Sequence, residues 1–231
     1  MPLAAHYIGW AFNNLAKETK KDPLQSYEPL SRTEETRLVR ALYRFQLYCN
    51  LFGVSHYRFR CQWMLEFDHV NILRIYLGNY EPWEVEEIAC IYAFTKATFN
   101  QVFDDIRWDV HQDNPRFEEH RPPTPQGAFN LDSGCGARLH PTDQDSKQKR
   151  RDPLPFQGDN EELPPLAWTL IWQGTYSNLF GWYIKDELRS WGYIMWDAAR
   201  LERTGAKEVL HRQWKACWED VDPRNRLRYA N

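Results

Sequence analysis

The fold of this chain is decided by the stretch from Pro82 to Ile106, which reads PWEVEEIACIYAFTKATFNQVFDDI. A proline at the first position and glutamates in the first turn favour a helix start, because proline lacks an amide hydrogen and negative charge complements the helix dipole. Side chains suited to an apolar stripe then alternate at spacings of three and four: Val85, Ile88, Tyr92, Thr95, Phe99, Val102 and Ile106. This spacing predicts one long amphipathic helix.

A second helix is predicted to begin after Ser31. Ser31 and Glu34 have the spacing of a capping box, in which the side chain of each residue accepts the backbone N–H of the other. Apolar residues follow on one helical face: Leu38, Leu42, Phe45, Cys49 and Phe52. Gly53 is a natural stop for this helix.

The last third of the chain carries a further helical pattern. Its apolar stripe consists of Phe180, Ile184, Leu188, Trp191, Met195 and Ala198. Gly205 follows as an end signal, and the apolar residues after it, from Val209 to Trp218, suggest a final short helix. We therefore expect a helix along this stripe and another after Gly205.

No region shows the sustained period-two alternation of strands, so the sequence predicts an all-α, multi-helix globular bundle of about six or seven helices. Nine of the 14 prolines, and no tryptophan, lie between residues 111 and 165. We interpret 111–165 as an irregular, partly disordered insertion. It separates an N-terminal helical half, 1–110, from a C-terminal half, 166–222, that packs on it. Residues 223–231 form a basic tail.

Aromatic residues are unusually frequent, with 11 Trp, 12 Tyr and 12 Phe. Helical spacing favours a core position for most tryptophans, where they bury a large area with few rotatable bonds. The alternative is that some of them face a protein partner or line an aromatic pocket for a small molecule. The candidates for this second role are Trp168, Trp172, Trp182, Trp191 and Trp196.

Carboxylates gather at the C-terminal end of the Pro82 helix, where they oppose the helix dipole. Asp104, Asp105 and Asp109, together with His111, could hold a divalent cation through oxygen ligands and one imidazole. The run resembles the aspartate-rich motif with which helical terpene cyclases bind magnesium and diphosphate. The other interpretation is a solvated helix end whose charge Arg107 offsets.

The charge balance and the apolar pattern narrow the classes of partner. The formal net charge of -3 gives no overall basic field, so we expect no binding to DNA. Residues 163–184 are uncharged and about long enough to span a bilayer, but prolines and amides interrupt them, and we expect no membrane insertion.

The chain begins without a basic leader and apolar run, and its five cysteines are widely spaced without a C-x-x-C pair. Both observations favour a cytoplasmic protein. A basic run could add a nuclear localisation signal; it consists of Lys147, Lys149, Arg150 and Arg151.

Three segments together resemble a large group of uncharacterised proteins of filamentous fungi. They are LSRTEETRLVRALYRFQLYCNLF at 30–52, PWEVEEIACI at 82–91 and SWGYIMWDAARL at 190–201. Many members of that group carry an F-box-like segment near the N-terminus. Because the first shared segment already begins at residue 30, we expect no separate F-box here. The resemblance implies a fungal family and brings no defined activity with it.

The sequence contains no phosphate-binding loop, serine-hydrolase elbow or zinc-protease motif, and it leaves open whether the protein is an enzyme. We expect an intracellular helical protein-interaction or adaptor module of fungal type, without a resident cofactor. The alternative is an enzyme of fungal secondary metabolism with an aromatic pocket. It would be either cyclase-like, with carboxylate-bound Mg²⁺, or a tRNA-dependent cyclodipeptide-forming enzyme.

Overall fold

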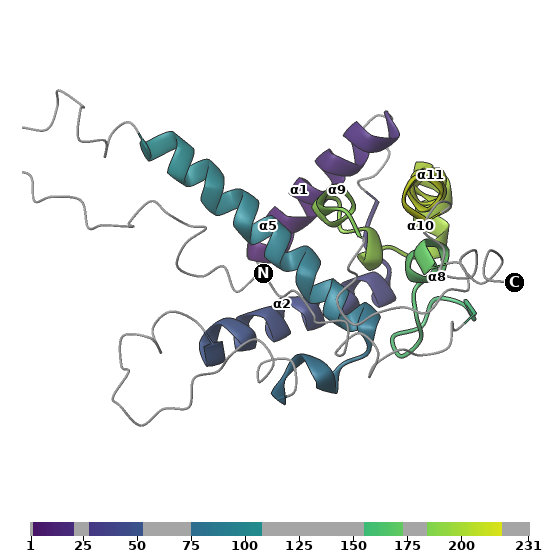
Figure 1. Cartoon of the computed structure of the whole chain (residues 1–231), viewed down its shortest axis with the longest axis horizontal. Coiled ribbons are helices and arrows are strands. Elements are labelled where there is room, and N and C mark those ends of the chain that lie inside the picture. Colours follow the sequence, from purple (N-terminus) through teal and green to yellow (C-terminus); the bar gives the residue numbers. More distant parts are fainter. Residues whose placement is uncertain (1, 21–27, 53–74, 108–154, 173–183, 219–231) are drawn as a thin grey trace, which may run out of the picture. The chain divides into compact units, whose positions relative to one another are not determined.

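A computed structural model of the chain describes residues 2–20, 28–52, 75–107, 155–172 and 184–218. For residues 2 and 214–218 it describes the backbone alone. The described residues form seven α-helices and two short 3₁₀-helices and contain no strand, which confirms the all-α prediction. The elements are α1 (Pro2–Thr19), α2 (Arg32–Phe52), η2 (Leu77–Asn79), α5 (Pro82–Arg107), α8 (Leu166–Trp172), α9 (Asp186–Ser190), η3 (Tyr193–Met195), α10 (Ala198–Thr204) and α11 (Ala206–Trp218) (Figure 1). No helix among them is long and apolar enough to cross a membrane.

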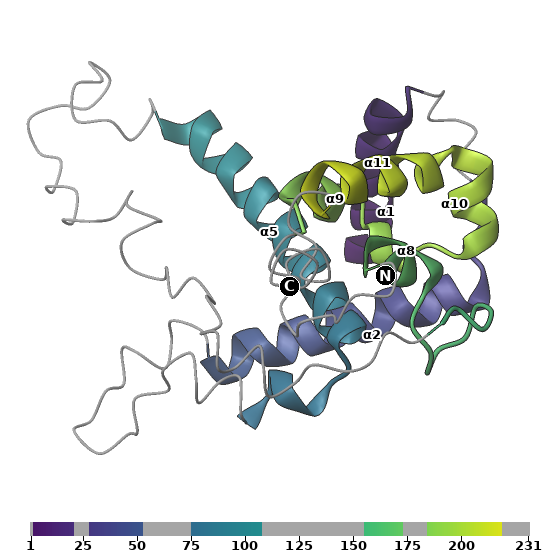
Figure 2. The ribbon, with the colours of Figure 1, turned by 45° about the vertical axis from the view of Figure 1, so that its right-hand side comes forward.

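The chain divides into two compact units, and α5 runs from one into the other. The first unit contains residues 1–94 and 141–231, and the second contains residues 95–140. Within the first unit, α1 packs against α2, α9 and α11, and α11 packs against α8 and α10. Figure 2 shows α11 crossing α1 and connecting back to α10. Elements from both ends of the sequence therefore share one core.

The helix α5 occupies the predicted stretch, but only the first part of its predicted apolar stripe is buried. Val85 and Ile88 are buried, whereas Tyr92 is 55% exposed. Beyond residue 94 the helix belongs to the second unit, and there the stripe is also exposed at Phe99, Val102 and Ile106. In the first unit, α5 instead buries the following residues: Trp83, Glu86, Glu87, Cys90, Ile91 and Phe94.

The predicted stripe from Phe180 to Ala198 is not one helix in its described part, 184–198, and this part of the prediction is wrong; Phe180 lies outside the described residues. The helix α9 ends at Ser190, and Gly192 adopts a left-handed conformation with φ 63°. The short η3 follows, and Trp196 and Asp197 are extended before α10 begins. Glycine is required at this break because an added Cβ would collide with the Tyr7 hydroxyl.

The interrupted segment 191–196 lies at the centre of the core. Every residue in it other than Gly192 is at most 1% exposed: Trp191, Tyr193, Ile194, Met195 and Trp196. It packs against α2, α8 and α9 through η3. The apolar pattern therefore predicted burial correctly and helical continuity incorrectly.

Candidate functional site

The central segment 191–196 creates a demand for buried polar partners, because irregular backbone does not satisfy its own N–H and C=O groups. Part of this demand is met locally. The Trp196 indole N–H donates to the Trp191 carbonyl at 2.8 Å, and the Met195 N–H donates to the Gly192 carbonyl at 2.9 Å. A further contact comes from Arg37 of α2, whose guanidinium donates to the Met195 carbonyl at 3.5 Å. Arg37 belongs to a network of charged side chains that is the candidate functional site. We call it the buried charged cluster, in which Arg40 and Arg189 are partly buried and the others are buried: Glu34, Arg37, Arg40, Glu86, Glu87, Arg189, Asp197 and Arg200.

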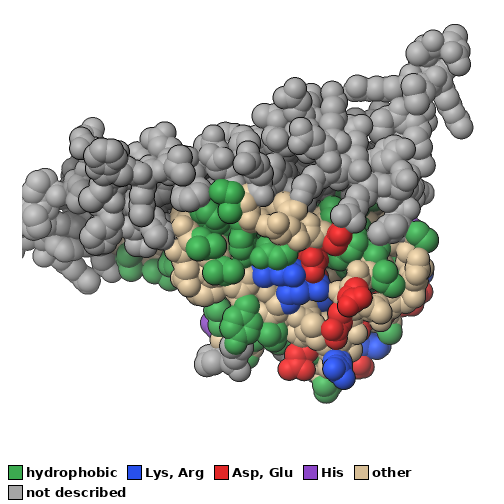
Figure 3. Space-filling model, turned by 90° about the horizontal axis from the view of Figure 1, so that it is seen from below, with side chains coloured by type: hydrophobic (Ala, Val, Ile, Leu, Met, Phe, Trp, Pro, Cys, Tyr) green, Lys and Arg blue, Asp and Glu red, His purple; other side chains and the backbone are tan. Residues whose placement is uncertain are grey.

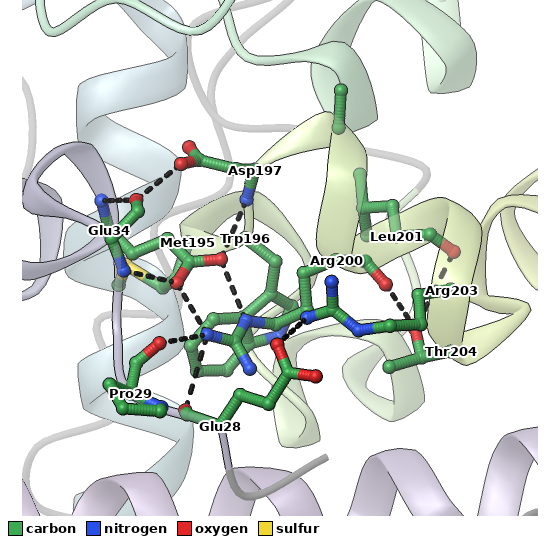
Figure 4. Close-up of polar contacts among 12 residues, drawn as sticks. Glu28, Pro29, Glu34, Met195, Trp196, Asp197, Arg200, Leu201, Arg203 and Thr204 are labelled. Carbon is green, nitrogen blue, oxygen red and sulfur yellow. Dashed lines mark hydrogen bonds and ion pairs between the residues drawn. The ribbon is translucent and has the colours of Figure 1, made fainter. Parts of the chain in front are cut away.

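The capping box predicted at Ser31 is present, and it also fastens α2 to α10. The Glu34 N–H donates to Ser31 Oγ at 3.1 Å, and the Ser31 N–H donates to Glu34 Oε2 at 3.0 Å. The same Glu34 carboxylate accepts the Asp197 N–H at 3.0 Å and two N–H groups of Arg200 at 2.8 Å each. Figure 4 shows Glu34 and Arg200 meeting between the two elements. One carboxylate thus caps a helix and neutralises a buried guanidinium.

Arg200 completes its contacts within the same region. Its Nη2 donates to the Pro29 carbonyl at 2.9 Å, and its guanidinium lies over the Phe12 ring, 5.2 Å from the centroid. The side chain is 4% exposed and Glu34 is 1% exposed. Because both charges are removed from water, each depends on the other for compensation.

Arg37 connects α2 to the residues that precede α10. Its Nη1 donates to Asp197 Oδ1 at 2.9 Å and to the Met195 carbonyl at 3.5 Å. Asp197 also accepts a short hydrogen bond from the Ser31 hydroxyl. Asp197 does not cap α10 with its own side chain. Asp159 does so instead, accepting the Ala198 N–H at 3.1 and 3.2 Å.

Two adjacent glutamates of α5 bind to opposite neighbours. Glu87 forms a bidentate pair with Arg40 of α2 at 2.6 and 3.1 Å, and Arg40 also contacts Glu84 at 3.1 Å. Glu86 forms a bidentate pair with Arg189 of α9 at 2.7 and 3.1 Å. Successive helical residues point about 100° apart, so consecutive positions can hold two different elements.

Burial and pairing move the pKa values of these carboxyls in different directions. Burial raises the pKa of Glu34, but the hydrogen bonds from Arg200 and from two backbone N–H groups outweigh it and leave the value below the usual range. Burial raises the pKa of Glu87 to about 7, although the hydrogen bonds from Arg40 lower it. The pKa of Glu86 is also raised by burial, against the opposing charge of Arg189.

The ion pairs and hydrogen bonds of this cluster connect helices to one another. Each carboxylate accepts hydrogen bonds from guanidinium, backbone or hydroxyl donors, and the paired elements are far apart in the sequence. A titratable group near neutral pH is often a sign of catalysis, but ion-pair networks of structural origin perturb pKa values as well. Among the described residues, the geometry supports a clamp that holds α2, α5, α9 and α10 around segment 191–196.

The structure places only part of the predicted metal site. Asp104 and Asp105 are exposed on the last turns of α5, in the second unit. Asp109 and His111 lie outside the described residues. Within the described ranges no three side chains that could ligate a metal come together. The metal site therefore stays a prediction, with two of its four residues located.

Four of the five candidate tryptophans are core residues of the first unit. Trp168, Trp172, Trp191 and Trp196 are each at most 4% exposed. Trp168 and Trp172 pack against each other on α8 with ring centroids 5.4 Å apart. Burial gives these four rings a packing role and does not support a partner surface. Their role as walls of a small-molecule pocket stays a prediction, and Trp182 lies outside the described residues.

The buried arginines and their carboxylate partners were missed at the level of the sequence. A signal was nevertheless present. Arg37, Arg40 and Arg44 follow one another at spacings of three and four along α2, and Glu84 and Glu87 are three apart on α5. Two complementary charged stripes of this kind indicate facing helices. The sequence pattern around Glu84 and Glu87 was interpreted only as negative charge that complements the helix dipole.

Comparison of the chain with protein-family models, with curated proteins and with solved structures finds no match.

Proposed function

We propose that this chain is a fungal intracellular protein-interaction module, in which a charge-clamped helical core presents the second half of α2 to a partner. The observation that carries the proposal is a row of exposed apolar side chains at spacings of four. Tyr43 is 61% exposed, Leu47 45% and Leu51 44%. Residues at this spacing lie one above another on the same side of a helix.

The composition of this half of α2 supports the proposal. Residues 42–52 read LYRFQLYCNLF and contain a single charged residue, Arg44. A helix that is apolar around most of its circumference is normally buried on more than one side. One side packs within the first unit, where Phe45, Tyr48 and Phe52 contact a small cluster that includes Tyr76. The other side, with the exposed row, is suited to an apolar groove or helix of another protein.

One face of the molecule combines chemical types that are common at interfaces. Figure 3 shows hydrophobic side chains beside a small group of basic side chains, with acidic side chains next to them. An apolar contact area bordered by charges gives both affinity and orientation to a complex. This mixture supports a protein partner.

The test is a comparison of Leu47→Lys with Gln46→Lys in affinity capture from a filamentous-fungal lysate. Both positions are exposed on α2, so circular dichroism should show the same helix content for both variants. We expect a set of proteins that wild type and Gln46→Lys retain and that Leu47→Lys loses. Identical sets for all three chains would refute the proposal, provided that sedimentation shows them all to be monomeric. Self-association lost only in Leu47→Lys would identify a second copy as the partner.

The enzyme alternative has less support in the described residues. Asp104 and Asp105 are exposed, and the four described candidate tryptophans, Trp168, Trp172, Trp191 and Trp196, are buried against other core residues. Neither group presents a concave arrangement of converging polar atoms, which is the usual basis for a catalytic hypothesis.

A further inference from the structure

Residues 155–165 are seated on the first half of α2. We call these residues the strap. The strap has no helix or strand and ends where α8 begins at Leu166. Its sequence, PFQGDNEELPP, is acidic and contains no basic residue. It contacts α2 through Thr36, Arg37 and Arg40.

The hydrogen bonds between α2 and the strap all run in one direction. Arg40 Nη1 donates to the Glu161 carbonyl at 2.9 Å, and Arg37 Nη2 donates to the Asn160 carbonyl at 3.4 Å. The Thr36 hydroxyl donates to Glu161 Oε1 at 3.2 Å. The helix thus supplies donors, and the strap supplies two backbone carbonyls and a carboxylate.

This pattern specifies the chemistry of an occupant. Every extended peptide offers carbonyl groups, so the hydrogen bonds from the two arginines contact the peptide backbone whatever its sequence. Specificity comes from the carboxylates at alternate positions. Glu161 meets Thr36, and Asp159 lies 3.9 Å from Arg37 Nη2 while it accepts the Ala198 N–H. An Asp-x-Glu segment in an extended conformation satisfies these contacts.

We propose that Thr36, Arg37 and Arg40 form a recognition site for extended acidic peptides of the Asp-x-Glu type, and that the strap occupies this site as an intramolecular competitor. The site is separate from the apolar row at Tyr43, Leu47 and Leu51, and it does not depend on that row having a partner. With the strap in place, Arg37 is only 1% exposed, so a peptide from another protein reaches it only after the strap leaves.

The attachment of the strap is suited to exchange. Asp159, Asn160 and Glu162 are exposed, and Pro164 and Pro165 are the buried anchors at its C-terminal end. A tethered segment acts at an effective concentration of about millimolar, so a free peptide competes poorly until the tethered one is weakened. Weakening the strap should therefore uncover binding that wild type conceals.

The experiment measures fluorescence anisotropy of a labelled peptide with the sequence of residues 156–163, FQGDNEEL, added to the full chain. Glu161→Arg places a cation against Thr36 and Arg40 and opens the strap. Glu162→Arg makes the same charge change one position along, at an exposed side chain, and is the matched control. We expect Glu161→Arg to bind the peptide at least tenfold more tightly than wild type or Glu162→Arg.

Two further measurements serve as controls. A peptide in which Asp and Glu are replaced by Asn and Gln should bind at least tenfold more weakly to Glu161→Arg. Should Glu161→Arg fail to fold, Asp159→Asn provides a milder opening and should tighten binding about threefold. Equal binding by wild type and by every folded variant, or equal binding of the neutral peptide, would overturn the proposal. Absence of peptide binding to a folded Glu161→Arg chain would do the same.

Discussion

Replacement of Glu34 by alanine removes the most connected carboxylate among the described residues. The side chain accepts hydrogen bonds from the Ser31 and Asp197 N–H groups and twice from Arg200. After truncation, Arg200 keeps contacts that include the Pro29 and Glu28 carbonyls and the Phe12 and Trp196 rings. None of these contacts carries a negative charge, and the variant removes the carboxylate that pairs with this buried guanidinium.

The expected cost follows from these lost contacts. Removal of one partner of a buried ion pair destabilises a protein by about 3–5 kcal/mol. Loss of the reciprocal cap between Ser31 and Glu34 adds about 1 kcal/mol. Glu34→Ala should therefore lower the free energy of unfolding by about 4–6 kcal/mol, which is a large part of the stability of an ordinary domain.

Urea unfolding followed by tryptophan fluorescence measures this loss, because buried indoles report on the same core. We expect the midpoint to fall by about 2 M in Glu34→Ala. The control is Glu202→Gln, which breaks the exposed pair with Lys207, 2.7 Å apart, and should leave the midpoint in place. The double variant Glu34→Leu/Arg200→Met removes both charges and keeps their volume, so it should recover much of the loss.

Two results would refute this reasoning. If Glu34→Ala unfolds at the same urea concentration as Glu202→Gln, the buried pair does not contribute as its geometry indicates. If the double variant is as unstable as Glu34→Ala, the cost arises from lost packing or lost capping, and not from an unpaired charge on Arg200.

Further predictions concern pH, the central break and the acidic helix end. Burial raises the pKa of Glu87 from 4.5 to about 7. Between these two pH values the folded chain holds a proton that the unfolded chain has released. The free energy of unfolding should therefore fall as the pH rises from about 4.5 through 7. This carboxyl should account for about 3 kcal/mol of that fall, and Glu87→Gln should remove it in urea titrations at pH 4.5 and 8. Gly192→Ala should lower the free energy of unfolding by at least about 2 kcal/mol, because φ is 63° at this position and the new Cβ meets the Tyr7 hydroxyl. Thermal unfolding of the double variant with Tyr7→Phe should show that part of this loss is restored. Mg²⁺ with diphosphate should leave the Tm unchanged, since Asp104 and Asp105 are exposed on α5, and an increase that Asp105→Ala abolishes would revive the metal-site hypothesis.

The parts of the fold that could be predicted from the sequence are those that local rules control. The capping box at Ser31 and the proline at residue 82 place the starts of α2 and α5 correctly, because a helix end depends on its own few residues. Gly205 ends α10 in a left-handed conformation, as an end signal there predicts.

The break at Gly192 could not be predicted in this way. The apolar residues around it keep helical spacing, and a single glycine within such a pattern is compatible with a helix. The left-handed backbone of Gly192 interrupts the helix, and the Tyr7 hydroxyl, which is far away in sequence, occupies the space that a Cβ would need there. A contact of this kind is a property of the tertiary structure, and no local pattern contains it.

The same limit applies to the buried charged cluster. Sequence rules assign glutamates to solvent, and on α5 they assign the core to Tyr92 instead of Glu87. The structure reverses the two, with Glu87 fully buried and Tyr92 exposed. The reversal depends on Arg40, which supplies a bidentate partner from α2 and makes the burial of a carboxylate tolerable.

These buried pairs also give the α2–α5 contact a single register. The second half of α2 is apolar around most of its circumference, and contacts between apolar side chains alone would tolerate a shift of one helical turn. Such a shift would carry Arg40 away from Glu87 and leave the fully buried Glu87 carboxyl without its guanidinium partner, at a cost of several kcal/mol. The alignment that keeps Arg40 with Glu87 also leaves Tyr43, Leu47 and Leu51 on the exposed side. The charges inside the first unit therefore fix the position along α5 of the helix that carries the exposed apolar row.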